Sequence, residues 1–203
     1  EDIIGWVYFT GLPQISYPVL QADDNEYYVH RTYDLSSDTS KAGCIFMDYR
    51  MADDFSSPYS IIYGHNVRDG SMLSDLAKLK DQTLYDEEPY FWILTPDKNY
   101  RYEIISAYTT GVNSDTYTLF KGPGEEFEEY LQKIKSYSDI KTEDTELTIK
   151  DKIVTLSTCT GNESTRFVVQ GKRVNAEDTG SGENTGSADS DAASVDSVTV
   201  QEG

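Results

Sequence analysis

The feature that most constrains the fold is a succession of short β-rich runs bounded by Asp, Asn, Gly, Ser or Pro. These runs cover residues 26–29, 43–47, 60–63, 90–94, 101–108, 152–158 and 165–174, and residues 4–9 read as a further strand or a helix end. Helices do not alternate regularly with them, which disfavours a doubly wound parallel sheet. Many short strands with few helices predict a closed or nearly closed β-barrel. The last two runs predict a hairpin with a six-residue loop.

Two segments have helical rather than strand periodicity. Apolar residues at helical spacing predict one helix over residues 71–80. The clearer one covers residues 125–138, where Phe127, Tyr130, Leu131 and Ile134 follow the i, i+3, i+4, i+7 pattern after a Gly-Pro-Gly sequence. The chain is therefore expected to be mainly β, with a few connecting helices.

Composition divides the chain near residue 175. Residues 175–203 contain seven acidic residues and no Lys, Arg or aromatic residue. Such a segment has too little apolar surface to offset the entropy lost on ordering. We therefore expect one folded domain at 1–174 and a disordered acidic, Ser/Gly-rich tail at 175–203.

Charge bears on nucleic-acid binding by this sequence, and hydropathy bears on a membrane-spanning segment. The net charge of −19 argues against nucleic acid, because phosphate binding needs clustered Lys and Arg. No run of 18 apolar residues and no signal peptide is present, and the chain begins at Glu1 without Met. The sequence is thus expected to be a mature or trimmed fragment from which an upstream anchor is missing.

The candidates for covalent catalysis are two cysteines and two histidines, which allow four pairings. Cys44 lies in an apolar run, where a thiol acts as a small hydrophobe. Cys159 follows a buried run and precedes a polar loop, so it combines rigidity with access. His65 also ends an apolar run, after a glycine, whereas His30 is expected at the surface.

Arg166 opens the run that follows Cys159. In a tight hairpin its guanidinium would lie beside the thiol and could bind a substrate carbonyl or an oxyanion. The alternative is an exposed arginine in a weak salt bridge with Glu163. A structural disulfide between Cys44 and Cys159 also remains open from the residues alone.

Three ordered motifs resemble the sortase family, and its class B in particular. Residues 155–159 (TLSTC) followed by Arg166 are similar to the sortase signature, and residues 62–66 (IYGHN) with 69–72 (DGSM) resemble the class B histidine motif. Residues 41–50 (KAGCIFMDYR) also resemble class B, although Cys44 stands where a residue such as Ser is more usual. Residues 5–6 (GW) and 17–21 (YPVLQ) match its amino-terminal region, so the likeness covers about residues 1–174.

The resemblance implies an eight-stranded sortase barrel with an extra class B helix near 125–138. It implies a cysteine transpeptidase with Cys159, His65 and Arg166 as catalytic residues, and a sorting-signal peptide, NPxTN-like, that is cut after Thr. By the same resemblance, the peptide would lie near Asn25, Val29, Tyr117, Ser157 and Thr160. A thioester would pass to a peptidoglycan cross-bridge or pilin amine at the outer membrane face or cell wall, held by an amino-terminal anchor.

No metal or organic cofactor is expected, because this chemistry needs none and the scattered acidic residues form no calcium loop. Two alternatives remain. A hydrolytic cysteine protease is disfavoured by the order of His65 before Cys159 and by the lack of a Trp near the thiol. A non-catalytic, wall-associated β domain would require the disulfide.

Overall fold

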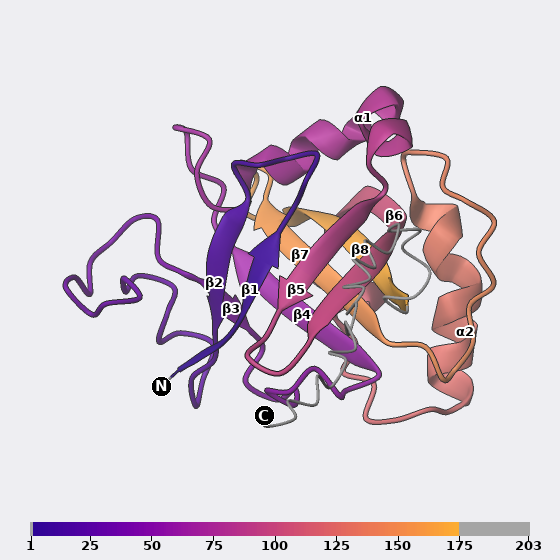
Figure 1. The fold of residues 1–203 in the computed structure, drawn as a ribbon, viewed down its shortest axis with the longest axis horizontal. Coiled ribbons are helices and arrows are strands. Elements are labelled where there is room, and N and C mark those ends of the chain that lie inside the picture. Colours follow the sequence, from indigo (N-terminus) through magenta and orange to yellow (C-terminus); the bar gives the residue numbers. More distant parts are fainter. Residues whose placement is uncertain (1, 175–203) are drawn as a thin grey trace, which may run out of the picture.

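The eight strands of the computed structural model, which describes residues 2–174, form a closed barrel (Figure 1). The order around the barrel is β1-β2-β3-β4-β7-β8-β6-β5. The strands are β1 (Ile3–Tyr8), β2 (Ser16–Leu20), β3 (Ile45–Met47), β4 (Tyr59–Gly64), β5 (Tyr90–Leu94), β6 (Asn99–Gly111), β7 (Ile153–Cys159) and β8 (Thr165–Val174). The predicted eight-stranded barrel is therefore confirmed.

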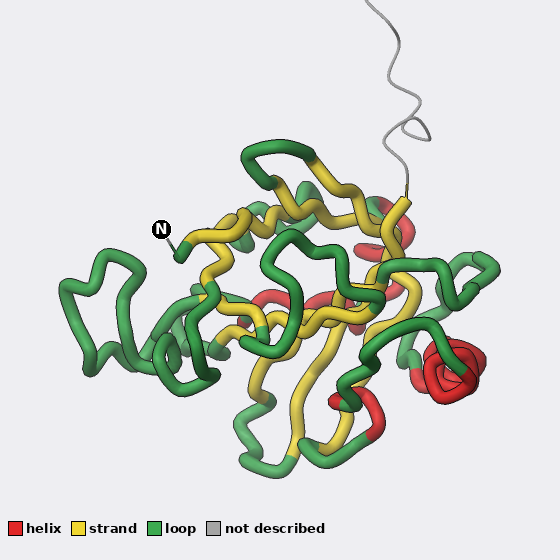
Figure 2. The backbone as a smooth tube through the Cα atoms, turned by 90° about the horizontal axis from the view of Figure 1, so that it is seen from below, coloured by secondary structure: helices red, strands yellow, loops and turns green. Residues whose placement is uncertain are grey.

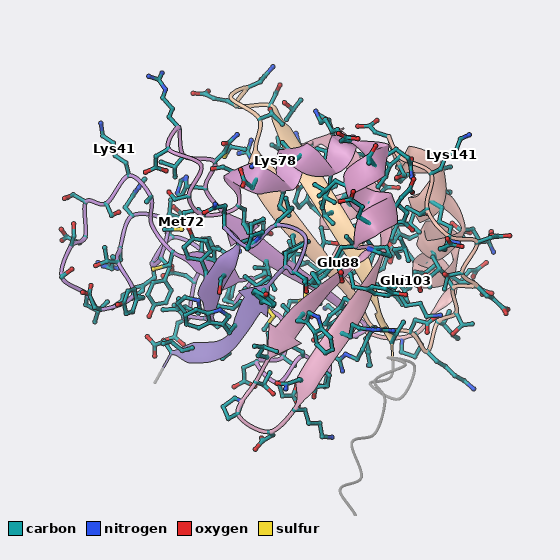
Figure 3. All side chains as sticks on the ribbon, turned by 45° about the horizontal axis from the view of Figure 1, so that its top comes forward. Lys41, Met72, Lys78, Glu88, Glu103 and Lys141 are labelled. Atoms are coloured by element: carbon teal, nitrogen blue, oxygen red, sulfur yellow. The ribbon has the colours of Figure 1, made fainter. Side chains whose placement is uncertain are left out.

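Helices lie outside the barrel, and the rest of the chain between strands is loop (Figure 2). The α-helices are α1 (Gln82–Glu87) and α2 (Glu125–Ile134), and the 3₁₀-helices are η1 (Ser74–Lys80), η2 (Asp115–Tyr117) and η3 (Lys135–Tyr137). The β2–β3 loop and the segment that follows α2 lie on opposite sides of the molecule, as the labelled side chains of Lys41 and Lys141 show (Figure 3). Within the described part of the chain, every helix falls short of the length and hydrophobicity of a membrane span.

The pairing of β4, β7 and β8 fixes the geometry that matters for function. Strands β4 and β7 run parallel, in register from Tyr59 opposite Ile153 to Gly64 opposite Thr158. Strand β8 pairs antiparallel with β7 and ends the ladder with Arg166 opposite Cys159. Every residue of β7 before Cys159 is buried, as expected for a strand covered on both faces. The ends of three strands therefore meet at one rim of the barrel.

Helix α2 packs against the barrel through the predicted apolar stripe, all four residues of which are buried. Its Tyr130 also enters a polar network inside the core. Gln170 donates to the hydroxyls of Tyr59, Tyr130 and Thr155 at 3.0, 2.6 and 3.0 Å. Because buried polar groups need partners, this network fixes how the helix sits on β4, β7 and β8.

Several predicted elements differ from the structure. Residues 26–29 form turns rather than a strand, because the Asp24 carboxylate accepts from the backbone N–H groups of Glu26 and Tyr27. The helix predicted at 71–80 is the 3₁₀-helix η1 and starts later, since Met72 (Figure 3) has a left-handed φ of 60°. The helix predicted at 125–138 ends as α-helix at Ile134 and continues as η3, and the β7–β8 loop is residues 160–164.

Candidate active site

A cavity of about 240 Å³ opens at the rim where β4 and β7 end and β8 begins. It is lined by residues of these three strands together with residues of β3 and of the β2–β3 loop. The lining residues are Asn25, Val29, Phe46, Tyr63, Gly64, His65, Ser157, Thr158, Cys159 and Arg166. The structure thus brings the three predicted catalytic residues into one cavity.

Cys159 is the last residue of β7 and is partly exposed, whereas the residue before it is 1% exposed. Its backbone carbonyl accepts a hydrogen bond of 2.8 Å from the side-chain amide of Asn66. Asn66 directly follows His65, so this bond holds the segment that carries His65 against the end of β7. The thiol is therefore held on a rigid strand end while it remains accessible, which is the setting of a reactive cysteine.

His65 follows Gly64 at the end of β4, next to the end of β7 in the parallel ladder. Its Nε2 lies 2.9 Å from the carbonyl oxygen of Val29. Because a carbonyl only accepts, Nε2 carries the proton, and in the neutral ring Nδ1 is the unprotonated nitrogen. The Val29 carbonyl therefore fixes both the tautomer and the orientation of the ring.

Gly43 explains why the Val29 carbonyl can lie where it does. A Cβ atom at Gly43 would lie 2.2 Å from that oxygen, and Gly43 has a left-handed φ of 55°. Both facts require glycine at this position. The β2–β3 loop is thus folded tightly enough to present a backbone acceptor to His65.

Arg166 is the direct cross-strand partner of Cys159. Partners in an antiparallel pair place their side chains on the same face of the sheet, so the guanidinium lies beside the thiol. Its Nη1 donates to the carbonyl oxygens of Glu163 at 3.0 Å and Thr165 at 2.8 Å. Arg166 therefore bonds the backbone of Glu163, and the salt bridge considered from the sequence is not formed.

Of the five predicted peptide-binding residues, three line the cavity and two do not. Asn25, Val29 and Ser157 line the cavity. Tyr117 is not among the lining residues but contacts one of them, since its hydroxyl shares a hydrogen bond of 2.8 Å with the Ser157 hydroxyl. The hydroxyl of Thr160 pairs instead with the hydroxyl of Thr165 across the β7–β8 loop, and Thr160 is not among the lining residues.

Four lining residues, Phe46, Tyr63, Gly64 and Thr158, were not predicted as site residues. All of them fall inside the three motifs, so the motifs themselves were the available signal. Thr158 has a buried hydroxyl without a hydrogen-bond partner within residues 2–174. The same part of the chain holds no cluster of three or more His, Cys, Asp or Glu side chains arranged to bind a metal ion.

Cys44, the second thiol, is not bonded to Cys159. It is 4% exposed and donates a hydrogen bond of 3.0 Å to the backbone carbonyl of Arg31. Burial, followed by the charge of Asp34, raises the pKa of the Cys44 thiol to about 11. This thiol is protonated at neutral pH, as expected for a structural cysteine.

Comparisons with known proteins agree with this geometry. The sortase domain family matches residues 13–174. Sortase B of Listeria monocytogenes is 40% identical over 179 residues, which cover 86% of this chain and 70% of that protein. A Staphylococcus aureus sortase B–substrate complex superposes with a TM-score of 0.77 at 29% identity, covering 86% and 81% of the two chains. A sortase B structure complexed with triglycine has a TM-score of 0.76, 29% identity and the same coverage. The chain belongs to the sortase family, as a cysteine transpeptidase of the sortase B type.

Proposed function

We propose that this enzyme cuts an NPxTN-like sorting signal after its Thr and joins the new carboxyl end to a cell-wall or pilin amine. The proposal rests on one observation: Cys159, His65 and Arg166 line a single cavity at the ends of three neighbouring strands. That arrangement supplies a nucleophile, a proton carrier and a fixed cation for an oxyanion.

In the first step, the Cys159 thiolate attacks the carbonyl carbon of the signal's Thr, and a tetrahedral oxyanion forms. Arg166 donates hydrogen bonds to this oxygen, for which Nε and Nη2 are suited because Nη1 bonds the carbonyls of Glu163 and Thr165. His65, as the imidazolium that has taken up the proton of the Cys159 thiol, gives that proton to the departing amine as the C–N bond breaks. With Nε2 bonded to the Val29 carbonyl, Nδ1 is the ring nitrogen that moves the proton. A thioester between Cys159 and the signal peptide results.

In the second step, an amine attacks the thioester carbonyl and His65 accepts a proton from it. The Cys159 thiolate leaves as the new amide bond forms, so the thiolate and imidazolium of the starting state are restored. The sortase B complexes with a substrate and with triglycine support a peptide and a glycine amine as the two ligand classes. We propose a cross-bridge or pilin amine as the acceptor, at the outer face of the membrane or in the cell wall, where an anchor upstream of residue 1 would hold the enzyme. The 1–174 domain carries this chemistry, and the 175–203 tail lies outside the described residues.

The peptide-binding residues are proposed on their place around the cavity. Asn25, Val29 and Ser157 would contact the signal directly, since they form its lining. Tyr117 would act on Ser157 through their shared hydrogen bond. Contact between Thr160 and the peptide remains a prediction, because the Thr160 hydroxyl is bonded to Thr165 across the β7–β8 loop.

The test is to incubate the enzyme with an NPxTN peptide, with and without a triglycine amine, and to follow intact mass and products. We expect an adduct on Cys159 equal to the peptide up to Thr, and a new amide product only when amine is present. Hydrolysis at the same rate with and without amine would favour the protease alternative. The absence of any cleavage across a panel of sorting-signal peptides would reject the proposed substrate.

A further inference from the structure

Asp48, which directly follows β3, is a carboxylate buried beneath the catalytic cavity. The residue is 0% exposed. An ion in the protein interior is costly unless hydrogen bonds replace its water. Five donors do so here: Arg50 N at 3.1 Å, Arg50 Nε at 2.8 Å, Arg50 Nη2 at 2.6 Å, Asn25 Nδ2 at 2.9 Å and the Tyr63 hydroxyl at 3.1 Å. We name Asn25, Asp48, Arg50 and Tyr63 the Asp48 cluster.

The Asp48 cluster reaches into the cavity through two of its members. Asn25 and Tyr63 both line the cavity, and both donate to the same oxygen, Oδ2 of Asp48. They come from different parts of the chain, Asn25 from the β2–β3 loop and Tyr63 from β4. A single buried oxygen therefore sets the relative position of two side chains on the cavity wall.

Asn25 is held at both ends of its amide. Its Nδ2 donates to Asp48, and its Oδ1 accepts from the backbone N–H of Tyr49 at 3.1 Å. These bonds determine which way the amide faces. An amide has two N–H groups and two acceptor lone pairs, so one of each is left for another partner. Such a preset donor and acceptor pair is complementary to a peptide amide.

The charge on Asp48 makes this arrangement permanent. Burial alone would raise the pKa of Asp48, but hydrogen bonds from Arg50 and Asn25 outweigh it and hold the pKa below its ordinary value. Burial, followed by the charge of Asp48, raises the pKa of Tyr63, so its hydroxyl stays a donor. The bonds in the Asp48 cluster therefore keep their direction throughout the neutral range.

Stability alone does not explain a charge at this position. Replacing a buried ion pair with well-packed apolar side chains is often neutral or stabilising. Two of the four cluster members, Asn25 and Tyr63, line the catalytic cavity, which indicates a role in orienting a ligand. We propose that Asp48 is a positioning residue that presets Asn25 and Tyr63 for binding of the sorting-signal peptide. This inference rests on the proposed function, because that function defines the ligand.

The test compares Asp48→Asn with the wild type in steady-state transpeptidation of an NPxTN peptide onto triglycine. The amide at position 48 replaces one acceptor oxygen with a donor, so donors of the cluster lose their partner in either orientation. Loss of such a bond is worth roughly a tenfold change in binding. We expect KM for the peptide to rise about tenfold, with kcat changed by less than about twofold.

Asp75→Asn is the matched control, because Asp75 is the other buried carboxylate in the described part of the chain. It pairs with Lys78 at 2.7 Å and is not among the residues that line the catalytic cavity. Its KM should stay at the wild-type value. An equal rise of KM in the control would overturn the proposal.

A double-mutant cycle separates positioning from general destabilisation. If Asp48 acts through Asn25, then Asp48→Asn should add little to the KM of Asn25→Ala. If Asp48→Asn does not fold, the same cycle is run with Asn25→Ala and Tyr63→Phe, which each remove one bond to Asp48. Additive effects, or a fall in kcat at unchanged KM, would overturn the proposal.

The positioning role of Asp48 and the proposed function of the enzyme are tested by different outcomes. Should Asp48→Asn leave KM unchanged while cleavage still requires Cys159, only the positioning role falls. Loss of the Cys159 requirement would instead reject the proposed function itself.

Discussion

Two regions of this molecule contain the same three residue types, a cysteine, a histidine and an arginine. One set lies at the ends of β4, β7 and β8, and the other lies in the β2–β3 loop and at its junction with β3. We call them the rim set (Cys159, His65, Arg166) and the loop set (Cys44, His30, Arg31). The two sets are close in space, since the His30 and His65 ring centroids are 6.1 Å apart.

The sets differ in what each side chain faces. In the loop set, the Cys44 thiol is buried against the Arg31 carbonyl, and the Arg31 guanidinium lies 4.0 Å above the ring of Tyr27. His30 is exposed at the surface. In the rim set, all three side chains line one cavity. The same residue types thus lie in different settings, because the strand ends direct three groups to the same space; we expect only the rim set to be reactive.

The largest expected difference in activity comes from substituting each of the two cysteines in turn. Cys159→Ala should abolish acyl-enzyme formation and cleavage, because no other described thiol lines the cavity. Cys44→Ser should leave kcat/KM close to wild type, since its thiol only bonds a backbone carbonyl. Intact mass spectrometry and product assays measure both. Cleavage by Cys159→Ala would show that Cys159 is not the nucleophile and that the rim set does not differ from the loop set in this respect.

The histidines offer the second comparison. His65→Gln should lower kcat/KM by roughly 10²–10⁴-fold, the usual range for loss of a general acid–base group. His30→Gln should change it little, although the two rings are near one another. A comparable loss in both variants would show that the imidazoles act as a pair, and the rim set would have to include His30.

Arg166→Ala should lower kcat by roughly 10²–10³-fold, as expected for loss of an oxyanion donor. Arg31→Ala is the matched control, since its guanidinium packs on a tyrosine ring outside the cavity. Arg166→Lys should lie between wild type and Ala, because Lys keeps the charge but loses the planar fork. Circular dichroism would establish that all three variants fold. Near-normal turnover of Arg166→Ala would return it to a structural role.

The smallest effect is one of stability and concerns Cys44. Its pKa rises from an ordinary 9.0 to about 11 on folding, so between these values the folded state binds more protons than the unfolded state. The contribution is complete below pH 9 and is lost as pH rises through 11. Urea unfolding of wild type and Cys44→Ser should diverge over this range, by an amount on the order of 2 kcal/mol. Parallel curves would place Cys44 in a solvated setting.

Much of the barrel was predictable from local signals. The strands at 90–94 and 165–174 match their predicted bounds, because each is a β-rich run between clear breakers. Strand β2 was not predicted from its residues. It contains Pro18, which cannot donate to a ladder and argues against a strand, yet it pairs with Trp6 of β1.

That Cys159, His65 and Arg166 share one cavity could be predicted because each falls in a recognisable motif at a strand end. The Asp48 cluster could not. Asp48 lies in a motif that was noted, but its partner Asn25 precedes it by 23 residues and its partner Tyr63 follows it by 15. Nothing local marks such a carboxylate as buried or satisfied. The Val29 carbonyl escaped prediction for a similar reason, since a backbone acceptor leaves no trace in residue type.

The closure of the barrel restricts how a peptide can be recognised. Each of the eight described strands has a neighbouring strand on both sides, so none is an edge strand open along its whole length to an incoming peptide. Main-chain pairing of that kind tolerates almost any side chain, whereas the connecting segments around the rim can discriminate. Peptide selectivity is therefore expected to depend on side chains around the rim, from the β2–β3 loop as well as from the strand ends.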